Sequence, residues 1–330
     1  MKEKTIYMVT PPAAATGGIE LCYQLVHQLT ELGGSAKVLF FHDSLWRPKK
    51  GMLENPIHKH YKKYNVQYTF HIEDIENNVL IVPEIYTHLL AEYKNVKKCV
   101  WWMSVDNYLT RFNDRKDFFR RVLPFYKSQQ KITELIAQEV IHFYQSHYAF
   151  EFLMENSVDE VKCFPLGDYI NDKFLNIKYD LSETRSDNVL YNPVKGIEFT
   201  RQLIEKFPEF NWIPLQNMSP SEIAELLLKS KVYIDFGNHP GMDRFPREAA
   251  MLGCCVIVGK KGSANYFEDV SISEEFKFEV IESQIDRIGK AINECLHDFH
   301  NQALKQEEYR RIISAQREKF ISDSKAILEL

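Results

Sequence analysis

The stretch of residues 232–258 constrains the fold more than any other part of the chain. Two apolar runs, 232–236 and 254–258, have the length and composition of strands that are buried on both faces. A polar loop and a helix that ends at Gly253 lie between them. Because a strand, a helix and a second strand in this order form the unit of a parallel sheet, the chain is predicted to have an α/β fold. Ligands bind such sheets beyond the carboxyl ends of the strands, where this loop is expected to lie.

The loop and the first turn of its helix carry the side chains of a predicted phosphate site. Arg244 and Arg247 stand beside the helix N-terminus, and both guanidinium groups and free backbone N–H groups suit phosphate oxygens. The ligand is therefore expected to be phosphorylated. The other candidate residues of the segment are His239, Gly241, Asp243 and Glu248.

Length and composition narrow the class of protein. The 330 residues, 45% hydrophobic and 26% charged, are typical of a globular protein with two domains. The net charge of −5 argues against a nucleic-acid partner. No apolar run approaches the roughly 20 residues that span a bilayer, and a strand pattern begins directly after residue 4, so a cytoplasmic protein is expected. The six cysteines lack metal-ligand spacing, which predicts reduced thiols and no structural metal.

Two groups of basic residues stand out in the first half. The simpler interpretation is a solvated surface, and the alternative is a peripheral contact with anionic lipid on the inner face of the cell membrane. The groups are Arg47, Lys49, Lys50, Lys59, Lys62 and Lys63, and then Arg111, Arg115, Lys116, Arg120 and Arg121.

Strand and helix signals alternate through both halves of the chain, which predicts two parallel sheets covered by helices. The alternation lapses between residues 168 and 187, so the predicted domains are 1–168 and 169–305. From residue 282 the pattern is helical, and 306–330 is predicted to be a helix that returns to the first domain. The predicted strands are 5–9, 36–41, 79–83, 98–103, 142–145, 161–165, 188–191, 212–215, 232–236 and 254–258, and the predicted helices include 18–32, 85–93, 148–155, 197–207 and 220–229.

The start of helix 220–229 is the most strongly marked boundary. Ser219 and Glu222 form a capping box, with Pro220 at the first helical position. The short loop that contains Asn217 therefore lies at the end of the preceding strand.

Four motifs together resemble the GT-B class of nucleotide-sugar-dependent glycosyltransferases, especially the retaining, family 4-like group that builds bacterial polysaccharides. The resemblance covers nearly the whole chain. It implies two Rossmann-like α/β domains that face one another across a cleft, the first binding the acceptor and the second the nucleotide sugar. The motifs are Thr-Gly-Gly-Ile-Glu at 16–20, Phe-Pro-Leu-Gly-Asp-Tyr-Ile at 164–170, Asn-Pro-Val-Lys-Gly at 192–196, and Arg-Glu-Ala-Ala-Met-Leu-Gly at 247–253.

The resemblance implies roles for the residues that match. Glu248 would hold the ribose hydroxyls of the nucleotide, because a carboxylate accepts two hydrogen bonds at once; a helix-start acid is the alternative. Lys195 would neutralise the donor diphosphate, or be an ordinary surface lysine. Gly17 and Gly18 would let the backbone approach the donor, or form a plain tight turn. Asn217 would lie in the loop that grips the nucleobase, or in a mere connection.

The chain departs from the family pattern at two places. The glutamate that stands eight residues before Glu248 in the family, where it would touch the donor sugar, is Pro240 here. Asp243 or His239 could replace it. The arginine that precedes the lysine of the Pro-x-Lys-Gly element is also absent, and the two arginines of the loop could supply its charge.

On the acceptor side, polar and aromatic residues follow predicted strand ends in the first domain. Trp101 and Trp102 are interpreted as core residues rather than as platforms for a sugar. If the reaction inverts the sugar, Asp106 or His147 could deprotonate the acceptor hydroxyl. In a retaining reaction the departing phosphate would take that proton.

The leading hypothesis is a metal-independent glycosyltransferase that uses no cofactor and moves a sugar from a nucleotide sugar to a glycan or lipid-linked acceptor, in bacterial surface polysaccharide synthesis. A nucleotide-sugar epimerase of the same fold is an alternative, because it would share the nucleotide site. A catalytically silent partner subunit is another, because the first glutamate is missing. The sequence does not identify the base, the sugar, the acceptor, the stereochemistry or the oligomeric state.

Overall fold

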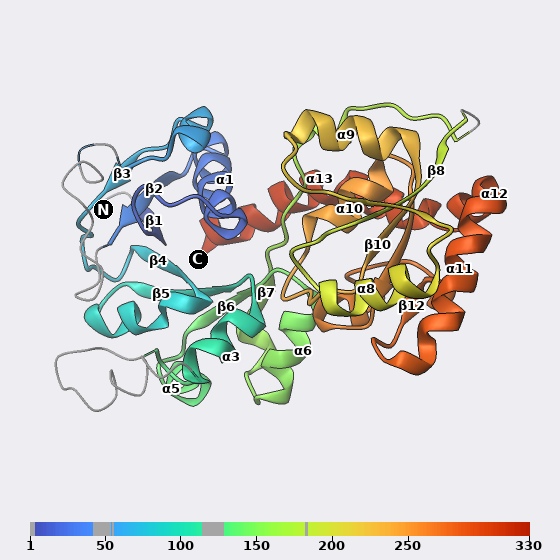
Figure 1. Cartoon of the computed structure of the whole chain (residues 1–330). Coiled ribbons are helices and arrows are strands. Elements are labelled where there is room, and N and C mark those ends of the chain that lie inside the picture. The colour runs from blue at the N-terminus through green and yellow to red at the C-terminus, as the bar shows by residue number, and fades with distance from the viewer. Residues whose placement is uncertain (1–3, 42–53, 55, 114–128, 182–183) are drawn as a thin grey trace. The chain divides into compact units, whose positions relative to one another are not determined.

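The computed structural model describes residues 4–41, 54, 56–113, 129–181 and 184–330. The chain divides into two compact units. Figure 1 colours the ribbon by residue number, so the segments of each unit can be followed along it. The first unit consists of Met1–Gln145, Ala149–Asp168 and Glu318–Leu330, and the second of Ser146–Tyr148 and Tyr169–Arg317.

The first unit contains a seven-stranded parallel sheet with the strand order β3-β2-β1-β4-β5-β6-β7. Its strands are β1 (Thr5–Thr10), β2 (Ser35–Phe40), β3 (Tyr68–Thr69), β4 (Val79–Pro83), β5 (Lys97–Trp102), β6 (Ile141–Tyr144) and β7 (Cys163–Pro165). Its described helices are α1 (Gly17–Glu31), η1 (Lys59–Tyr64), η2 (Glu84–Glu92), α3 (Val105–Asn113), α5 (Ile132–Ala137), α6 (His147–Glu155) and η3 (Glu160–Lys162).

The middle strands of this sheet are the core of the first unit. All five residues of β4 are buried, as expected for a strand covered on both faces. Trp101 and Trp102 are fully buried, which confirms their interpretation as core residues. Their indole N–H groups donate to the carbonyl of Leu166 at 2.9 Å and to Nδ1 of His142 at 2.9 Å. Buried indoles keep a polar partner in this way.

The second unit contains a five-stranded parallel sheet with the order β12-β11-β10-β8-β9. Its strands are β8 (Ser186–Tyr191), β9 (Asn211–Pro214), β10 (Ser230–Asp235), β11 (Cys255–Gly259) and β12 (Lys277–Phe278). Its helices are α7 (Asp172–Leu175), α8 (Ile197–Lys206), α9 (Pro220–Lys229), α10 (Arg244–Met251), η4 (Gly262–Asn265), η5 (Glu274–Phe276), η6 (Glu282–Gln284), α11 (Ile285–His297) and α12 (Phe299–Leu304).

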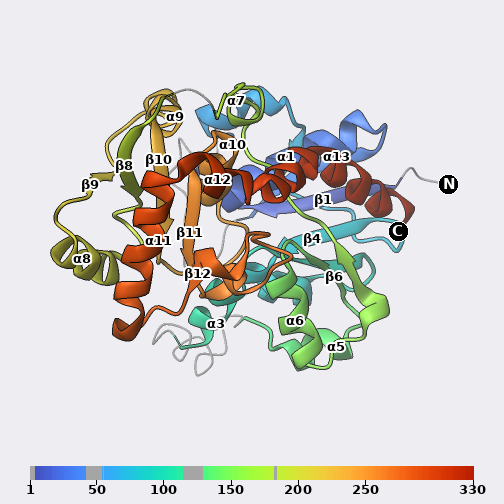
Figure 2. The same cartoon turned by 90° about the vertical axis from the view of Figure 1, so that its right-hand side faces the viewer.

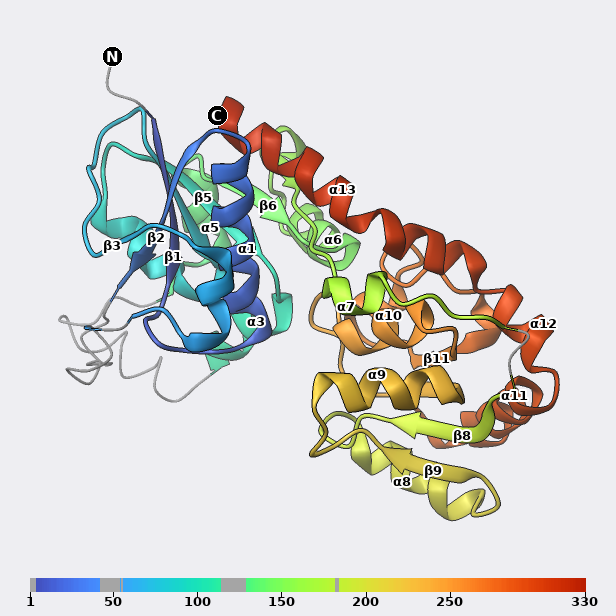
Figure 3. The ribbon, with the colours of Figure 1, turned by 90° about the horizontal axis from the view of Figure 1, so that it is seen from above.

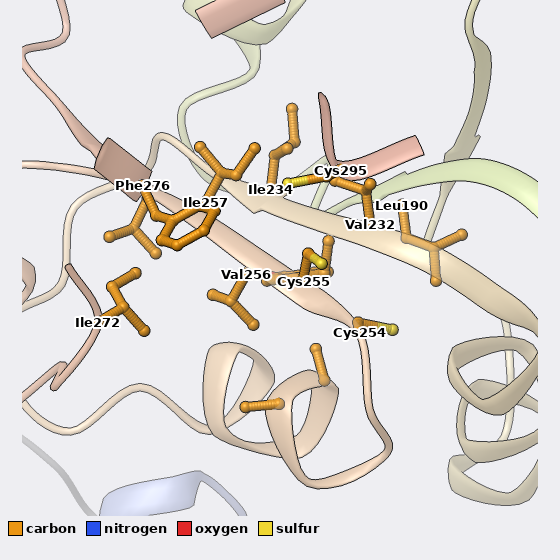
Figure 4. Close-up of a cluster of buried hydrophobic side chains, with 14 of the residues drawn as sticks. Leu190, Val232, Ile234, Cys254, Cys255, Val256, Ile257, Ile272, Phe276 and Cys295 are labelled. Atoms are coloured by element: carbon orange, nitrogen blue, oxygen red, sulfur yellow. The ribbon is translucent and has the colours of Figure 1, made fainter. Parts of the chain in front are cut away.

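Helices cover both faces of this second sheet. Figure 3 shows α9 and α10 on one side of the strands and α8 on the other, and Figure 2 shows α11 on the side of α8. Right-handed crossovers between parallel strands produce this arrangement. Between the layers lies an apolar core from β8, β10, β11, η5 and α11, which Figure 4 shows in close-up. Five of the six free cysteines are buried, so they act as small apolar side chains.

The predicted elements agree closely with the observed ones. Strand 79–83 and helix 220–229 have the predicted bounds, and most other predicted strands are displaced by one or two residues at their ends. The capping box of α9 is present, with Ser219 Oγ accepting from the backbone N–H of Glu222 at 3.3 Å. The predicted helix at 85–93 is instead a 3₁₀ segment, η2, which Tyr86 interrupts with a non-helical backbone.

The C-terminal segment is helical, as predicted, and its last helix, α13 (Glu307–Glu329), has residues in both units. Phe320 and Ile327 are buried. Lys4 donates through Nζ to the carbonyl of Leu328 at 2.7 Å, so this end of α13 packs within the first unit. Among the described residues, no helix is both long enough and apolar enough to span a bilayer.

Candidate functional site

The carboxyl ends of β8 and β10 carry two loops that touch through their backbones. We call residues 192–196 the β8 loop and residues 236–243 the β10 loop. Gly196 has a φ of +63°, and a Cβ atom there would come within 2.5 Å of the carbonyl carbon and oxygen of Phe236. A Cβ atom on Gly237 would collide with the side chain of Lys195. Only glycine fits at both positions, so the two loops hold each other in place.

This contact places Lys195 against the far end of the β10 loop. Its Nζ lies 2.8 and 2.9 Å from the two carboxylate oxygens of Asp243 and 3.4 Å from the carbonyl oxygen of Asn238. Asp243 is the N-cap residue of α10. The Lys195 side chain is 36% exposed and that of Asp243 21%, so the ion pair lies at the surface of the second unit.

His239 lies beneath this ion pair and is completely buried. Its Nδ1 is 3.1 Å from Oδ2 of Asp243, and its Nε2 is 3.6 Å from Oδ1 of Asp235. Neither ring nitrogen makes an aligned hydrogen bond with a residue that the structure describes. The imidazole is therefore held between two carboxylates by charge and packing more than by directed hydrogen bonds.

Asp235, the last residue of β10, anchors the base of this arrangement. Its Oδ1 accepts from the backbone N–H of Gly237 at 3.0 Å, and its Oδ2 accepts from the hydroxyl of Tyr233 at 3.0 Å. Both residues of this second contact are buried. The four side chains of Lys195, Asp235, His239 and Asp243 are called the charged cluster below.

Burial and neighbouring charges shift the pKa values of His239 and Asp243 in opposite directions. Burial opposes the charge on His239, but contact with Asp243 and the negative charge of Asp235 raise the pKa of the imidazole above its ordinary 6.5. Burial likewise opposes ionisation of Asp243, but His239 and Lys195 hold the pKa of this carboxyl below its ordinary 3.8. Both shifts favour the ionised form of the group concerned.

The cluster also has the donor atoms of a cation site. Asp235, His239 and Asp243 can each offer one ligand atom, and these atoms lie within 4.8 Å of one another. In this conformation the ammonium of Lys195 contacts both oxygens of Asp243. A lysine already supplies the positive charge that a metal ion would bring.

The remaining predicted donor residues lie around the cluster. Arg247 is 1% exposed, and it donates to the carbonyl oxygens of Asp243 and Met242 at 3.1 and 2.7 Å and to Oε1 of Gln316 at 2.8 Å. Its guanidinium thus holds the β10 loop from the inside. Arg244 is half-buried, and Glu248 is 8% exposed in the next turn of α10.

The middle of the β10 loop is also held by hydrogen bonds from Ser263 on η4. Gly241 accepts a hydrogen bond from the hydroxyl of Ser263 at 2.7 Å, and the carbonyl of His239 accepts from the backbone N–H of Ser263 at 2.8 Å. Gly262, with a φ of +56°, has no room for a Cβ atom against His239. A narrow crevice, too tight to hold a water molecule, lies beside the loop, and its lining includes His239, Asp243, Arg247, Asp269 and Tyr309.

Asn217 and His147 lie outside the charged cluster; both group with the second unit, although the rest of α6 from Ala149 belongs to the first. Asn217 is exposed after β9 and has a φ of +55°, a conformation that asparagine tolerates. His147 is half-buried at the start of α6, where its backbone N–H donates to Oδ1 of Asp269 at 2.6 Å. Burial raises the pKa of Asp269 to about 6.

The predicted residues of the first unit lie at the start of two helices. Thr16 caps α1, accepting from the backbone N–H of Ile19 at 3.4 Å. A Cβ atom on Gly17 would meet nothing within 4 Å, and one on Gly18 would make an ordinary 3.9 Å contact with Met103. Asp106 is half-buried in the first turn of α3.

The basic groups are only partly described. Lys59, Lys62 and Lys63 are exposed on η1. Arg111 donates to the carbonyl of Ile85 at 3.0 Å. The others lie outside the described residues: Arg47, Lys49, Lys50, Arg115, Lys116, Arg120 and Arg121.

Sequence reasoning missed two buried carboxyl groups at sheet edges. Asp235 had a signal, because it is the one acid inside an apolar run. Glu84 had one too, since it directly follows strand β4. Glu84 is 2% exposed, and its Oε2 accepts from the backbone N–H of Met103 at 3.1 Å. Burial raises the pKa of Glu84 to about 7.

No protein-family model matches the chain. No curated protein matches its sequence. Solved structures do match over nearly its whole length. A glycosyltransferase from Rickettsia africae ESF-5 is 13% identical, with a TM-score of 0.62, over 100% of this chain and 98% of that chain. Anabaena Alr3699/HepE in complex with UDP is 11% identical, with a TM-score of 0.61, over 99% and 98%.

A third match is the sucrose-phosphate synthase of Thermosynechococcus elongatus, 13% identical with a TM-score of 0.55 over 98% of this chain and 100% of that chain. At these identities the comparison reports on the fold. The neighbours are glycosyltransferases of the GT-B type, and this chain has the same two parallel sheets with interleaved helices. The chain therefore has the GT-B fold, with two Rossmann-like α/β domains.

Proposed function

We propose that the protein is a glycosyltransferase that takes a sugar from a nucleoside-diphosphate sugar and transfers it to a glycan or lipid-linked acceptor without a metal ion. The observation that carries the proposal is the Lys195–Asp243 pair, at the carboxyl edge of a parallel sheet and the N-terminus of a helix. Such an edge is where α/β proteins bind their ligands. A cation and a helix N-terminus together favour a phosphate group there.

Lys195 would balance the charge of the leaving group. In the transfer, the acceptor oxygen forms a bond to the anomeric carbon, while the bond from that carbon to the diphosphate oxygen breaks. The acceptor proton passes to the departing phosphate in a retaining reaction, or to Asp106 or His147 in an inverting one. The nucleoside diphosphate leaves with both electrons of that bond. An ammonium group placed at the diphosphate stabilises this negative charge as it develops.

Asp243 is the better of the two candidates to replace the missing glutamate. Both oxygens of Asp243 reach the surface lysine, whereas His239 is completely buried beneath it. A group that contacts the donor sugar must reach the surface, and Asp243 does so at the start of α10. Glu248, one turn further along α10, would hold the ribose hydroxyls.

The solved structures support this choice of ligand. Anabaena Alr3699/HepE was solved with UDP, with UDP-glucose, and with UDP and glucose. An α-glucosyltransferase of 11% identity was also solved with UDP. The family 4-like grouping, the role in surface polysaccharide and the membrane contact rest on sequence motifs and charge alone.

Nucleotide binding tests the proposal directly. Titration calorimetry with UDP, GDP, CMP, ADP and dTDP, each with and without magnesium, is expected to show that one of them binds without the metal. Glu248→Ala should weaken that binding by about tenfold, the factor for losing hydrogen bonds to a charged group. Glu225→Ala, which removes an exposed acid on α9, is the matched control and should bind like the wild type.

Two outcomes would contradict the proposal. If no nucleotide binds, the protein would be a silent scaffold of this fold. If Glu248→Ala binds as tightly as the control, the ribose site lies elsewhere. An epimerase would bind the nucleotide but release an altered free sugar from the donor alone, which chromatography of the reaction products would reveal.

A further inference from the structure

The charged cluster contains a residue that the proposed reaction does not use. His239 is completely buried and lies between Asp235 and Asp243. Removing an imidazole from water has a cost that a purely structural residue, such as an apolar side chain, would not incur. A buried histidine beneath the Lys195–Asp243 pair is therefore expected to have a role of its own.

The charges within the cluster identify what the imidazole contributes. The two carboxylates carry two negative charges, and Lys195 carries one positive charge. A protonated His239 makes the cluster neutral. The surrounding carboxylates favour that form, because they raise the pKa of His239 above its ordinary value.

Asp243 consequently lies between two basic groups. Lys195 contacts it from the surface at 2.8 Å, and Nδ1 of His239 lies 3.1 Å away on the buried side. A carboxylate shared between two positive groups holds each of them less tightly than it would hold one alone. Other ionisable groups lie near the imidazole: Tyr233 on β10 donates to Asp235, and Arg247, Asp269 and Tyr309 line the same crevice as His239.

We propose that His239 is a positioning residue: it competes with Lys195 for the carboxylate of Asp243, so that the ammonium of Lys195 can move onto a ligand phosphate. Without His239, Asp243 would hold Lys195 alone and a phosphate would have to displace a stronger ion pair. The glycine contact between the two loops keeps the groups close enough for this exchange. The inference rests on the proposed function, since it assumes that Lys195 meets a diphosphate.

UDP and uridine test the inference, because only UDP carries the phosphates that Lys195 would contact. His239→Gln should weaken UDP binding by about tenfold, the factor for a charge-assisted contact, and leave uridine binding unchanged. In an Asp243→Asn background the same change should alter UDP binding by less than about twofold, because the competing carboxylate is gone. His297→Gln, at an exposed histidine on α11, is the control.

Several outcomes would overturn the inference. His239→Gln could leave UDP affinity unchanged, weaken uridine equally, or cause the same loss in the Asp243→Asn background. The single variant Asp243→Asn tests the competition while His239 is kept. It should bind UDP at least as tightly as the wild type does, and weaker binding would contradict the proposed competition. If the wild type binds none of the nucleoside diphosphates, the proposed function fails instead, so the two failures are distinguishable.

Discussion

The carboxyl edges of the two sheets differ in how their ionisable side chains are stabilised. At the edge of the second unit, four ionisable side chains compensate one another next to the surface. At the edge of the first unit, Glu84 is buried with a pKa of about 7, so burial favours its neutral form. The first arrangement keeps charged groups near the surface, and the second favours an uncharged group in the interior.

The two edges also differ in their glycines. Gly196 and Gly237 have no room for a Cβ atom, because the neighbouring loop backbone or side chain fills that space. Gly17 has open space around it. The loops at the edge of the second sheet therefore require glycine at these positions. At the edge of the first sheet, the described surroundings of Gly17 would accept a larger residue. Three substitutions can break or sharpen this contrast.

The largest effect is expected at the edge of the second sheet. Gly196→Val would place a branched side chain at a positive φ and against the backbone of Phe236, which should destabilise the fold by about 4 kcal/mol. Gly17→Ala, at the first residue of α1, should be neutral or slightly stabilising. Urea unfolding followed by circular dichroism measures both. Equal stability of the two variants would remove the distinction between the edges.

The second effect concerns the buried carboxyl of the first unit. Its raised pKa means that the folded protein binds the Glu84 proton more tightly than the unfolded chain does, so stability falls as pH rises from about 4.5 to about 7. Glu84→Gln removes this cost and should make the protein about 3 kcal/mol more stable than the wild type at pH 8, with little difference near pH 4.5.

Urea unfolding at the two pH values measures this change. Glu160→Gln, which alters an exposed acid on η3, should show no such pH dependence. A Glu84→Gln protein that is less stable than the wild type at pH 8 would mean that the carboxylate is ionised and needed for its hydrogen bond with Met103.

The third and smallest effect is a loss of stability, opposite in sign to the gain expected for Glu84→Gln, and it concerns the second unit. Because the pKa of Asp243 is lowered, its carboxylate stabilises the fold above about pH 4, and this contribution is lost as pH falls below the ordinary 3.8. Asp243→Asn should cost about 2 kcal/mol at pH 7, since it leaves Lys195 and His239 without their shared partner. The cost should shrink toward pH 3, where thermal unfolding can be compared.

A control for this variant is Glu225→Gln, which breaks the exposed Lys229–Glu225 pair and should change stability by less than about 0.5 kcal/mol. If Asp243→Asn were as harmless as the control, the charged cluster would be an ordinary surface ion pair. The contrast between the two sheet edges would then lose its basis in the second unit.

The fold was predictable because its signals are local and repeated. The apolar runs of β4, β10 and β11 and the capping box of α9 each depend on a few adjacent residues. The two-residue strands β3 and β12 carry no such pattern, since their pairing depends on neighbours distant in sequence.

The candidate site was only partly predictable. Lys195 and Asp243 are 48 residues apart, and they meet because the Gly196–Gly237 contact brings two loops together. Sequence motifs named both residues but not their pairing. The buried positions of His239 and Arg247 could not be read from the sequence, because exposure depends on how the β10 loop packs against η4 and α13.

The last helix has a consequence for how the protein is made. Glu318–Leu330 belongs to the first unit, where Leu328 accepts a hydrogen bond from Lys4 and contacts Gly34. During synthesis on a ribosome, the first unit therefore lacks one of its packing elements until residues 318–330 have been translated. Its apolar surface must remain partly uncovered while the whole second unit emerges, a period in which chaperones can bind. A stop codon at residue 318 would leave the first unit, rather than the second, incomplete.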